Sequence, residues 1–214
     1  MLLAAAAFVA AGIASSMAQS NVYSLNVVGY VNRSFPAFQF VMVNNPLQAS
    51  NNTLNAIMPT APDGTSVFKW NVANQDLDAT VPTFITGSGW TPNGTVSPGE
   101  GFFVASGADF TNTFVGEVRQ GALSTPLVGN SAFEAIGSQV PVGGTITSVL
   151  TGYPATDGDT IFPWSVANQD LDPTTSTFVV GPGWTPNINV GVGDGFFLSR
   201  AGGPVNWVRN FTVQ

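Results

Sequence analysis

Side chains that could bind a metal ion recur in a five-residue segment, Asn-Gln-Asp-Leu-Asp, found at 74–78 and again at 168–172. Their alternating oxygen atoms resemble the start of a calcium-binding loop. The segment lacks the glycine and the later glutamate of that loop, and Asp and Asn side chains also bind turn backbones. We therefore expect a structural turn without a cofactor, and calcium binding is the alternative. The candidate ligands are Asn74, Asp76, Asp78, Asn168, Asp170 and Asp172.

A second repeated motif, Gly-x-Gly-Trp-Thr-Pro-Asn, occupies 87–93 and 181–187. Its indoles, Trp90 and Trp184, could lie on equivalent surfaces and hold sugar rings, as in carbohydrate-binding modules. Tryptophan is highly buried on average, so a core position is the favoured interpretation. Trp70 and Trp164 lie inside strand-like runs, and we expect both in the core.

The glycine-rich segments 98–103 and 192–197 could suggest phosphate binding, and each contains a carboxylate, Glu100 or Asp194. Phosphate loops need a following helix or a lysine, whereas an apolar strand-like run follows here. Two carboxylates could form a glycosidase pair. They occupy the same place in each repeat, so a duplicated structural role is the better interpretation.

The composition excludes several kinds of catalytic site. The chain has neither His nor Cys, which removes Ser-His-Asp and Cys-His sites, thiolate or histidine zinc sites and disulfides. A net charge of −7 with 5 Lys and Arg residues argues against nucleic acid as a partner, because phosphate binding needs a clustered basic face. We predict a protein that is not an enzyme.

An internal duplication organises the chain. Residues 64–103 align without a gap on 158–197, at a constant offset of 94, and 24 of the 40 positions are identical. Weaker matches upstream pair 38–46 with 133–141 and 28–31 with 115–118. The sequence therefore predicts two units of roughly ninety residues, at 19–112 and 113–214.

Each unit is predicted to be all-β. Short apolar runs alternate with polar residues or are rich in β-branched and aromatic residues, and the chain has 24 Gly and 15 Pro for turns. Segments 53–58 and 147–150 could each form a helical turn, stopped by a nearby proline. We expect two tandem lobes resembling β-sandwiches or small barrels.

The N-terminal segment 1–18 has the pattern of a signal peptide. Fourteen apolar residues precede Ser16 and Ala18, the small residues expected before a cleavage site. A helix of that length spans about 21 Å, against about 30 Å for a bilayer core, so no stable membrane span is predicted. No Lys or Arg precedes Arg33, and retention as a packed segment is the alternative to cleavage after Ala18. In either case we expect an extracellular or cell-surface protein.

The low charge has two interpretations: uncharged Thr and Asn on solvent-facing strand positions, as in many extracellular β-proteins, or self-association into a fibre, layer or coat. Only 8% of the residues are charged, against about 25% in ordinary soluble domains, so copies repel one another weakly. We expect three similar strands to bracket the two repeats, with 113–120 serving both lobes, which leaves 23–32 and 206–214 as candidate open edges. Pairing of these two strands within one molecule is the alternative. The candidate assembly residues are Tyr23, Leu25, Val27, Val31, Trp207, Phe211 and Val213.

Four segments together resemble a group of secreted proteins of verrucomicrobial and related bacteria. They are Asn-Val-Val-Gly-Tyr-Val-Asn at 26–32, Pro-Gly-Glu-Gly-Phe-Phe-Val at 98–104, Thr-Phe-Val-Gly-Glu-Val at 113–118 and Arg-Asn-Phe-Thr-Val at 209–213. The resemblance implies export, a duplicated β-architecture and no assigned enzymatic activity. The sequence thus predicts a secreted structural protein that associates with itself as a filament, layer or matrix, and a carbohydrate-binding module is the alternative.

Overall fold

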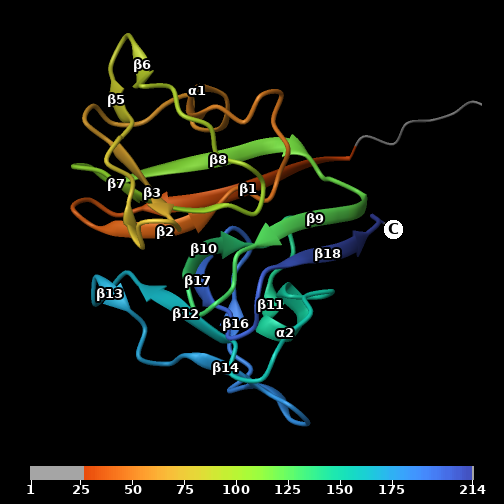
Figure 1. The fold of residues 1–214 in the computed structure, drawn as a ribbon. Helices are drawn as coiled ribbons and strands as arrows, with labels where there is room; N and C mark the ends of the chain where they lie inside the picture. The colour runs from red at the N-terminus through yellow and green to blue at the C-terminus, as the bar shows by residue number, and fades with distance from the viewer. Residues whose placement is uncertain (1–26, 214) are drawn as a thin grey trace, which may run out of the picture.

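The computed structural model of the protein describes residues 27–213 and shows two all-β lobes (Figure 1). The predicted fold class and the predicted duplication are both confirmed. The signal-like segment 1–18, Tyr23 and Leu25 lie outside the described residues. No helix between residues 27 and 213 is both long enough and apolar enough to span a bilayer.

The strands and helices follow the same order in both lobes, except that the second lobe adds the short pair β11 and β16. The first lobe contains β1 (Val28–Phe35), β2 (Phe40–Asn44), α1 (Leu54–Ile57), β3 (Ser66–Asn71), β4 (Asp76–Leu77), β5 (Thr83–Ile85), β6 (Gly89–Thr91), β7 (Gly101–Ala105) and β8 (Phe110–Glu117). The second contains β9 (Gly121–Leu127), β10 (Phe133–Gly137), β11 (Gly144–Thr145), α2 (Ile146–Val149), β12 (Thr160–Ser165), β13 (Asp170–Leu171), β14 (Ser176–Val179), β15 (Gly183–Thr185), β16 (Asn189–Val190), β17 (Gly195–Ser199) and β18 (Val205–Phe211).

Each lobe packs a two-stranded ribbon against a larger antiparallel sheet. The sheet order is β2-β7-β3-β5-β6 in the first lobe and β10-β17-β12-β14-β15 in the second, with β4 added to β3 and β13 added to β12. The ribbons are β1-β8 and β9-β18. In β8, buried Asn112 and Phe114 alternate with exposed Thr111, Thr113 and Val115, so one face of the ribbon covers the core.

The predicted helical turns at 53–58 and 147–150 are confirmed as the single turns α1 and α2. Leu54 and Ile57 are buried in the first lobe, and Ile146 and Val149 are buried in the second. These pairs are three residues apart and so lie on the same face of a helical turn. Each turn therefore closes one end of its lobe's core.

The prediction of three bracketing strands with a shared central strand is wrong. β8 passes through the predicted boundary at 112–113 and pairs with β1 from Phe110 to Glu117, while β9 starts at Gly121 and pairs with β18. There are four such strands, and the terminal strands pair within one molecule, which confirms the alternative. Each terminal strand therefore has one edge paired within its own lobe, in a two-stranded ribbon that covers the core.

The candidate assembly residues that the structure describes contact the protein's own core. Val31 and Trp207 are buried, and the indole Nε1 of Trp207 donates a hydrogen bond of 3.0 Å to the Thr151 carbonyl. Val27, Phe211 and Val213 pack, partly buried, against the core of the first lobe. These side chains already contact the molecule's own core, and their role in contacts between copies stays a prediction.

Candidate functional site

The two lobes meet through reciprocal contacts between equivalent strands. The Asn44 amide donates to the Gly193 carbonyl (2.9 Å), and the Gly137 amide donates to the Gly99 carbonyl (2.9 Å). Isolated bridges pair Val43 with Asp194 and Glu100 with Ile136. Because equivalent residues exchange contacts, the lobes resemble the two halves of an isologous dimer.

The glycine-rich turns lie at this junction. A Cβ atom on Gly101 would stand 2.8 Å from the Ile136 nitrogen, and one on Gly195 would stand 2.8 Å from the Val43 oxygen. Neither backbone position can therefore accept a side chain without moving the opposite lobe. The two segments are tight turns into buried strands, as the sequence predicted.

The carboxylates of these turns form separate ion pairs. Glu100 lies 2.6 Å from the Lys69 ammonium, and Asp194 lies 2.6 Å from the Arg33 guanidinium of the other lobe. Glu100 also accepts a hydrogen bond from the Ser97 amide, and Asp194 accepts one from the Gly191 amide. These contacts support the duplicated structural role over a glycosidase pair.

The Asn-Gln-Asp-Leu-Asp segments hold the lobes together through their glutamines. Gln75 Oε1 accepts from the Phe133 amide (2.7 Å), and its Nε2 donates to the Phe133 carbonyl (3.1 Å). Gln169 makes the equivalent pair of bonds to Phe40, at 2.7 and 3.3 Å. Both glutamines have a φ of 53°, a left-handed conformation that non-glycine residues rarely adopt. We call these two side chains the glutamine bridges.

The candidate calcium ligands mostly bind nearby backbone and side chains. Asp76 and Asp170 each accept a hydrogen bond of 2.7 Å from the following leucine amide. Asp78 accepts from the Asn71 amide group, and Asp172 accepts from the Thr174 amide. Asn74 and Asn168 are exposed in the same two turns. Within residues 27–213, no three His, Cys, Asp or Glu side chains cluster closely enough to hold a metal ion. These contacts support the structural turn, and calcium binding stays a prediction.

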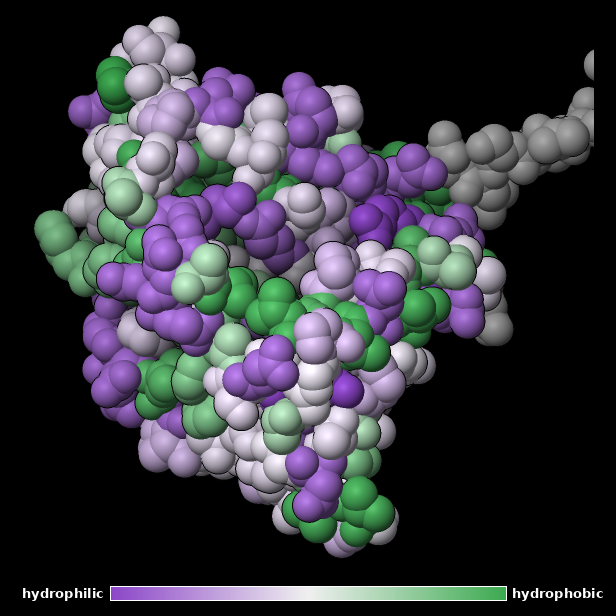
Figure 2. Space-filling view, viewed as in Figure 1, coloured by the Kyte–Doolittle hydropathy of each residue, from purple (hydrophilic) through white to green (hydrophobic). Residues whose placement is uncertain are grey.

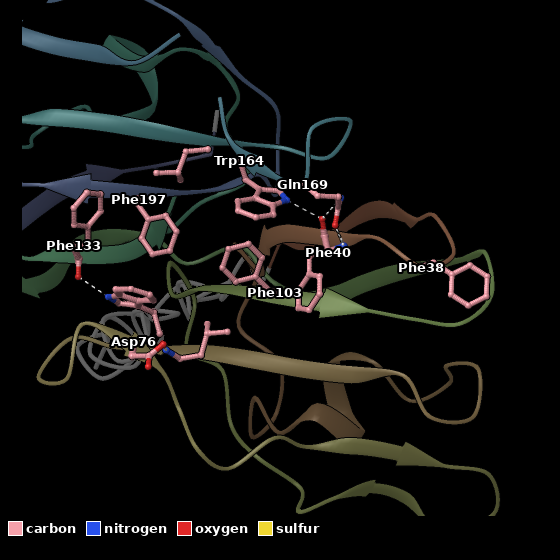
Figure 3. Close-up of a pocket in the computed structure, with 11 residues that line it drawn as sticks. Phe38, Phe40, Asp76, Phe103, Phe133, Trp164, Gln169 and Phe197 are labelled. Atoms are coloured by element: carbon pink, nitrogen blue, oxygen red, sulfur yellow. Dashed lines mark hydrogen bonds between the residues drawn. The ribbon is translucent and has the colours of Figure 1, made fainter. Parts of the chain in front are cut away.

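An aromatic groove of about 750 Å³ runs along the junction between the lobes (Figure 3). Its volume lies in the range of about 300–1,000 Å³ that is usual for ligand pockets. The lining is mostly apolar, and Asp76 is the one ionisable side chain among the described residues that form it. The lining residues are Phe38, Phe40, Trp70, Asp76, Leu77, Phe103, Phe133, Trp164, Gln169, Leu171 and Phe197.

The two indoles of the groove are held rigidly. Trp164 contacts Phe103 edge-on, with ring centroids 4.9 Å apart, and Trp70 contacts Phe197 in the same way at 4.9 Å. The Trp164 Nε1 donates to the Phe40 carbonyl (2.8 Å), and the Trp70 Nε1 donates to the Phe133 carbonyl (2.7 Å). Figure 3 shows Trp164 and Gln169 reaching from the second lobe to the backbone of Phe40. The N–H groups of both indoles are therefore already bonded to backbone carbonyls, and both rings line the groove.

The expectations for the tryptophans are partly reversed. Trp90 and Trp184 are only 2% and 7% exposed, so the hypothesis of a paired sugar platform on these residues is wrong and the core interpretation is confirmed. The Trp90 Nε1 donates to the Met58 carbonyl (2.7 Å) inside the first lobe. Trp70 and Trp164, expected in the core, are only partly buried and line the groove. The duplicated motifs contain both tryptophan pairs, but the sequence could not decide which pair is buried and which lies at the surface.

The buried charged side chains of the second lobe do not line the groove. Asp159 pairs with Arg200 (3.0 Å) and accepts a hydrogen bond from the Tyr153 hydroxyl (2.6 Å), where the first lobe has Thr65 and Ser106. Burial raises the pKa of the Glu134 carboxyl above its ordinary value of 4.5, although backbone hydrogen bonds from Val128 and Gly129 act in the opposite direction. None of these groups lines the groove, so they belong to the stability of the lobe.

Comparison of the chain with protein-family models, curated proteins and solved structures gives no match. The resemblance to secreted verrucomicrobial proteins therefore stays a prediction. The function has to be argued from the groove itself.

Proposed function

We propose that this chain is an exported, non-enzymatic structural protein that associates with copies of itself, and that the aromatic groove is its contact surface. The observation that carries the proposal is the groove of about 750 Å³, with its rigid apolar lining open at the surface. Exposed apolar surfaces of this kind mark sites of interaction.

The lining favours binding over catalysis. General acid–base chemistry needs a positioned side chain that can give or take a proton. Asp76 is the one such group among the described lining residues, and it already accepts a hydrogen bond from the Leu77 amide. The groove offers apolar area instead, worth about 25 cal/mol for each Å² removed from water.

The polar groups at the groove favour an apolar protein segment over a sugar. The indole N–H groups of Trp70 and Trp164 and the side-chain amide of Gln169 already bind the Phe133 and Phe40 backbones. A sugar ring needs hydrogen-bond partners as well as an aromatic face, because buried polar groups without partners cost free energy. A segment that buries aliphatic side chains does not have that requirement.

The charge distribution permits close contact between copies. Few residues are charged and the net charge is only −7, so repulsion between subunits is weak and is screened further at physiological salt. Export rests on the signal-like segment 1–18, and the mature N-terminus is testable. Sequencing the protein recovered from the medium or cell surface should give Gln19 as its first residue.

Sedimentation velocity over a concentration series tests the proposal. We expect the wild-type protein to form larger species as its concentration rises. Leu77→Asp places a charge in the groove and should suppress them, whereas Ile85→Asp, on an exposed strand end outside the groove, should not. Melting curves of both variants control for folding.

A wild-type protein that stays monomeric at its solubility limit would overturn the proposal. If that monomer also bound polysaccharide, and Trp164→Ala abolished the binding while Trp90→Phe kept it, carbohydrate binding at the groove would replace self-association.

A further inference from the structure

We propose that the groove of one copy receives the turn that follows β14 of a second copy, so that subunits join head to tail. This inference rests on the proposed function and names the segment that fills the groove. The turn comprises Val179, Val180, Gly181 and Pro182, and we call it the apolar turn.

The apolar turn is exposed and hydrophobic. Val179 is 40% exposed and Val180 is 72% exposed. Figure 2 shows a hydrophobic tip at the lower end of the molecule, where Figure 1 places the end of β14. Exposed side chains of this size in a projecting turn are well placed to enter a groove.

The apolar turn is also held in one conformation. The Val180 amide donates a hydrogen bond of 2.9 Å to Asp157 Oδ1, and β14 pairs with β15 up to Val179 and Gly183. A segment that is already ordered loses little conformational entropy on binding.

The first lobe shows that the fold does not require this apolar turn. Its equivalent turn reads Ile-Thr-Gly-Ser at 85–88, and the Thr86 amide donates to Asp63 Oδ1 (2.7 Å) as the Val180 amide does to Asp157. Thr86 and Ser88 thus stand where the second lobe has Val180 and Pro182. Two polar residues build the same turn, so the apolar pair serves another purpose.

Phe38 shows the complementary difference at the groove. It lines the groove, is 85% exposed and has a φ of 59°, a costly conformation for a residue of its size. Ser131 occupies the equivalent place in the second lobe, with a φ of 61°. The two residues also make equivalent backbone hydrogen bonds of 2.7 Å within their own lobes. The Phe38 amide donates to the Ser106 carbonyl, and the Ser131 amide donates to the Arg200 carbonyl. The local structure therefore forms with a serine, and the phenylalanine extends the apolar groove.

These two differences point to a heterologous contact. The first lobe has the added aromatic residue at the groove, and the second lobe has the added apolar residues at its far end. An isologous contact would use the same patch on both copies, whereas a head-to-tail contact uses two different patches. The first lobe thus has the extended groove and the second lobe has the apolar turn, which are the two different patches that a head-to-tail contact uses.

The charges of the two surfaces are compatible. Residues 173–193 contain no Asp, Glu, Lys or Arg, and Asp76 is the one ionisable residue among the described groove residues. The charge beside the apolar turn is Asp157, whose Oδ1 accepts a hydrogen bond of 2.9 Å from the Val180 amide, and this carboxylate is exposed.

The test measures association by sedimentation velocity and light scattering for three variants of the full chain. Val180→Asp changes the apolar turn, Phe38→Ser gives the groove the residue of the second lobe, and Thr86→Asp is the matched control on the first lobe. We expect Val180→Asp and Phe38→Ser each to raise the dissociation constant about tenfold or more, because each removes apolar contact. Thr86→Asp should associate like the wild type.

A mixing experiment tests the direction of the contact. Val180→Asp keeps a complete groove and Phe38→Ser keeps a complete apolar turn, so the mixture should form 1:1 dimers that do not grow further. Longer species in the mixture, or no complex at all, would overturn the head-to-tail arrangement.

The outcomes separate this inference from the proposed function. A monomeric wild type overturns both. A wild type that assembles, together with Val180→Asp and Phe38→Ser proteins that fold and assemble equally well, overturns only the inference. Wild-type assembly that stops at a dimer also overturns it, because a head-to-tail contact leaves a free groove on every dimer.

Discussion

Replacing the glutamine bridges tests how the two lobes are joined. Gln75→Ala removes both hydrogen bonds to Phe133 and the bond from Nε2 to the Val72 carbonyl. A neutral hydrogen bond contributes about 0.5–1.5 kcal/mol net. Because Gln75 is exposed, water can replace the lost partners, and each of the three bonds should contribute near the lower end of that range. The variant should therefore lower the free energy of unfolding by about 1–2 kcal/mol in total. Gln169→Ala should cost about the same, since it breaks the equivalent bonds to Phe40.

The effect is measurable by urea unfolding followed through tryptophan fluorescence. For a slope of about 2 kcal/mol/M, each variant should lower the midpoint by about 0.5–1 M. The double variant should show roughly the sum, because the two bridges lie in different parts of the junction and contact different strands.

Asn74→Ala, in the same turn as Gln75, is the matched control and should change stability by less than about 0.5 kcal/mol. The argument fails if both glutamine variants unfold like the wild type, or if Asn74→Ala is as damaging as Gln75→Ala. Gln75→Asn adds a second check, because asparagine tolerates the left-handed conformation but is one methylene too short to reach Phe133.

Three further predictions concern the core, the Asx segments and a buried carboxyl. Trp90→Ala and Trp184→Ala should each cost about 3–5 kcal/mol in denaturant unfolding; normally melting variants would contradict their burial. Melting temperatures in EDTA and in millimolar calcium should agree, and a calcium-dependent rise that is lost in Asp76→Ala and Asp170→Ala would instead establish a calcium site. Because burial raises the pKa of Glu134, its contribution to stability is present below about pH 4.5 and is lost as the pH rises through the folded pKa. Glu134→Val should therefore gain stability relative to the wild type as the pH rises above about 4.5, and a difference independent of pH would refute this.

Local patterns in the sequence determined the fold class, the duplication and the positions of the short turns. Strand runs alternate with a period of two, and glycine or proline ends them, so neighbouring residues are enough to recognise β-structure. Segments 53–58 and 147–150 were recognisable as helical turns because a proline stops each one.

The positions of Trp70 and Trp90 could be decided only by the tertiary structure. Both belong to duplicated motifs, lie in strands and have apolar neighbours, yet one lines the groove and the other is buried in a lobe. The difference depends on which strands face the opposite lobe, and that depends on pairing between distant segments.

The role of the Asn-Gln-Asp-Leu-Asp segment shows the same limit. Its carboxylates and amides suggested a metal site, whereas its glutamines bind Phe133 and Phe40, which lie 58 and 129 residues away in the chain. The sequence by itself determined that the segment is a polar turn present twice. Only the packing of one lobe against the other decided what the turn contacts, because hydrogen-bond partners far apart in the chain are brought together by the burial of the aromatic side chains between the lobes.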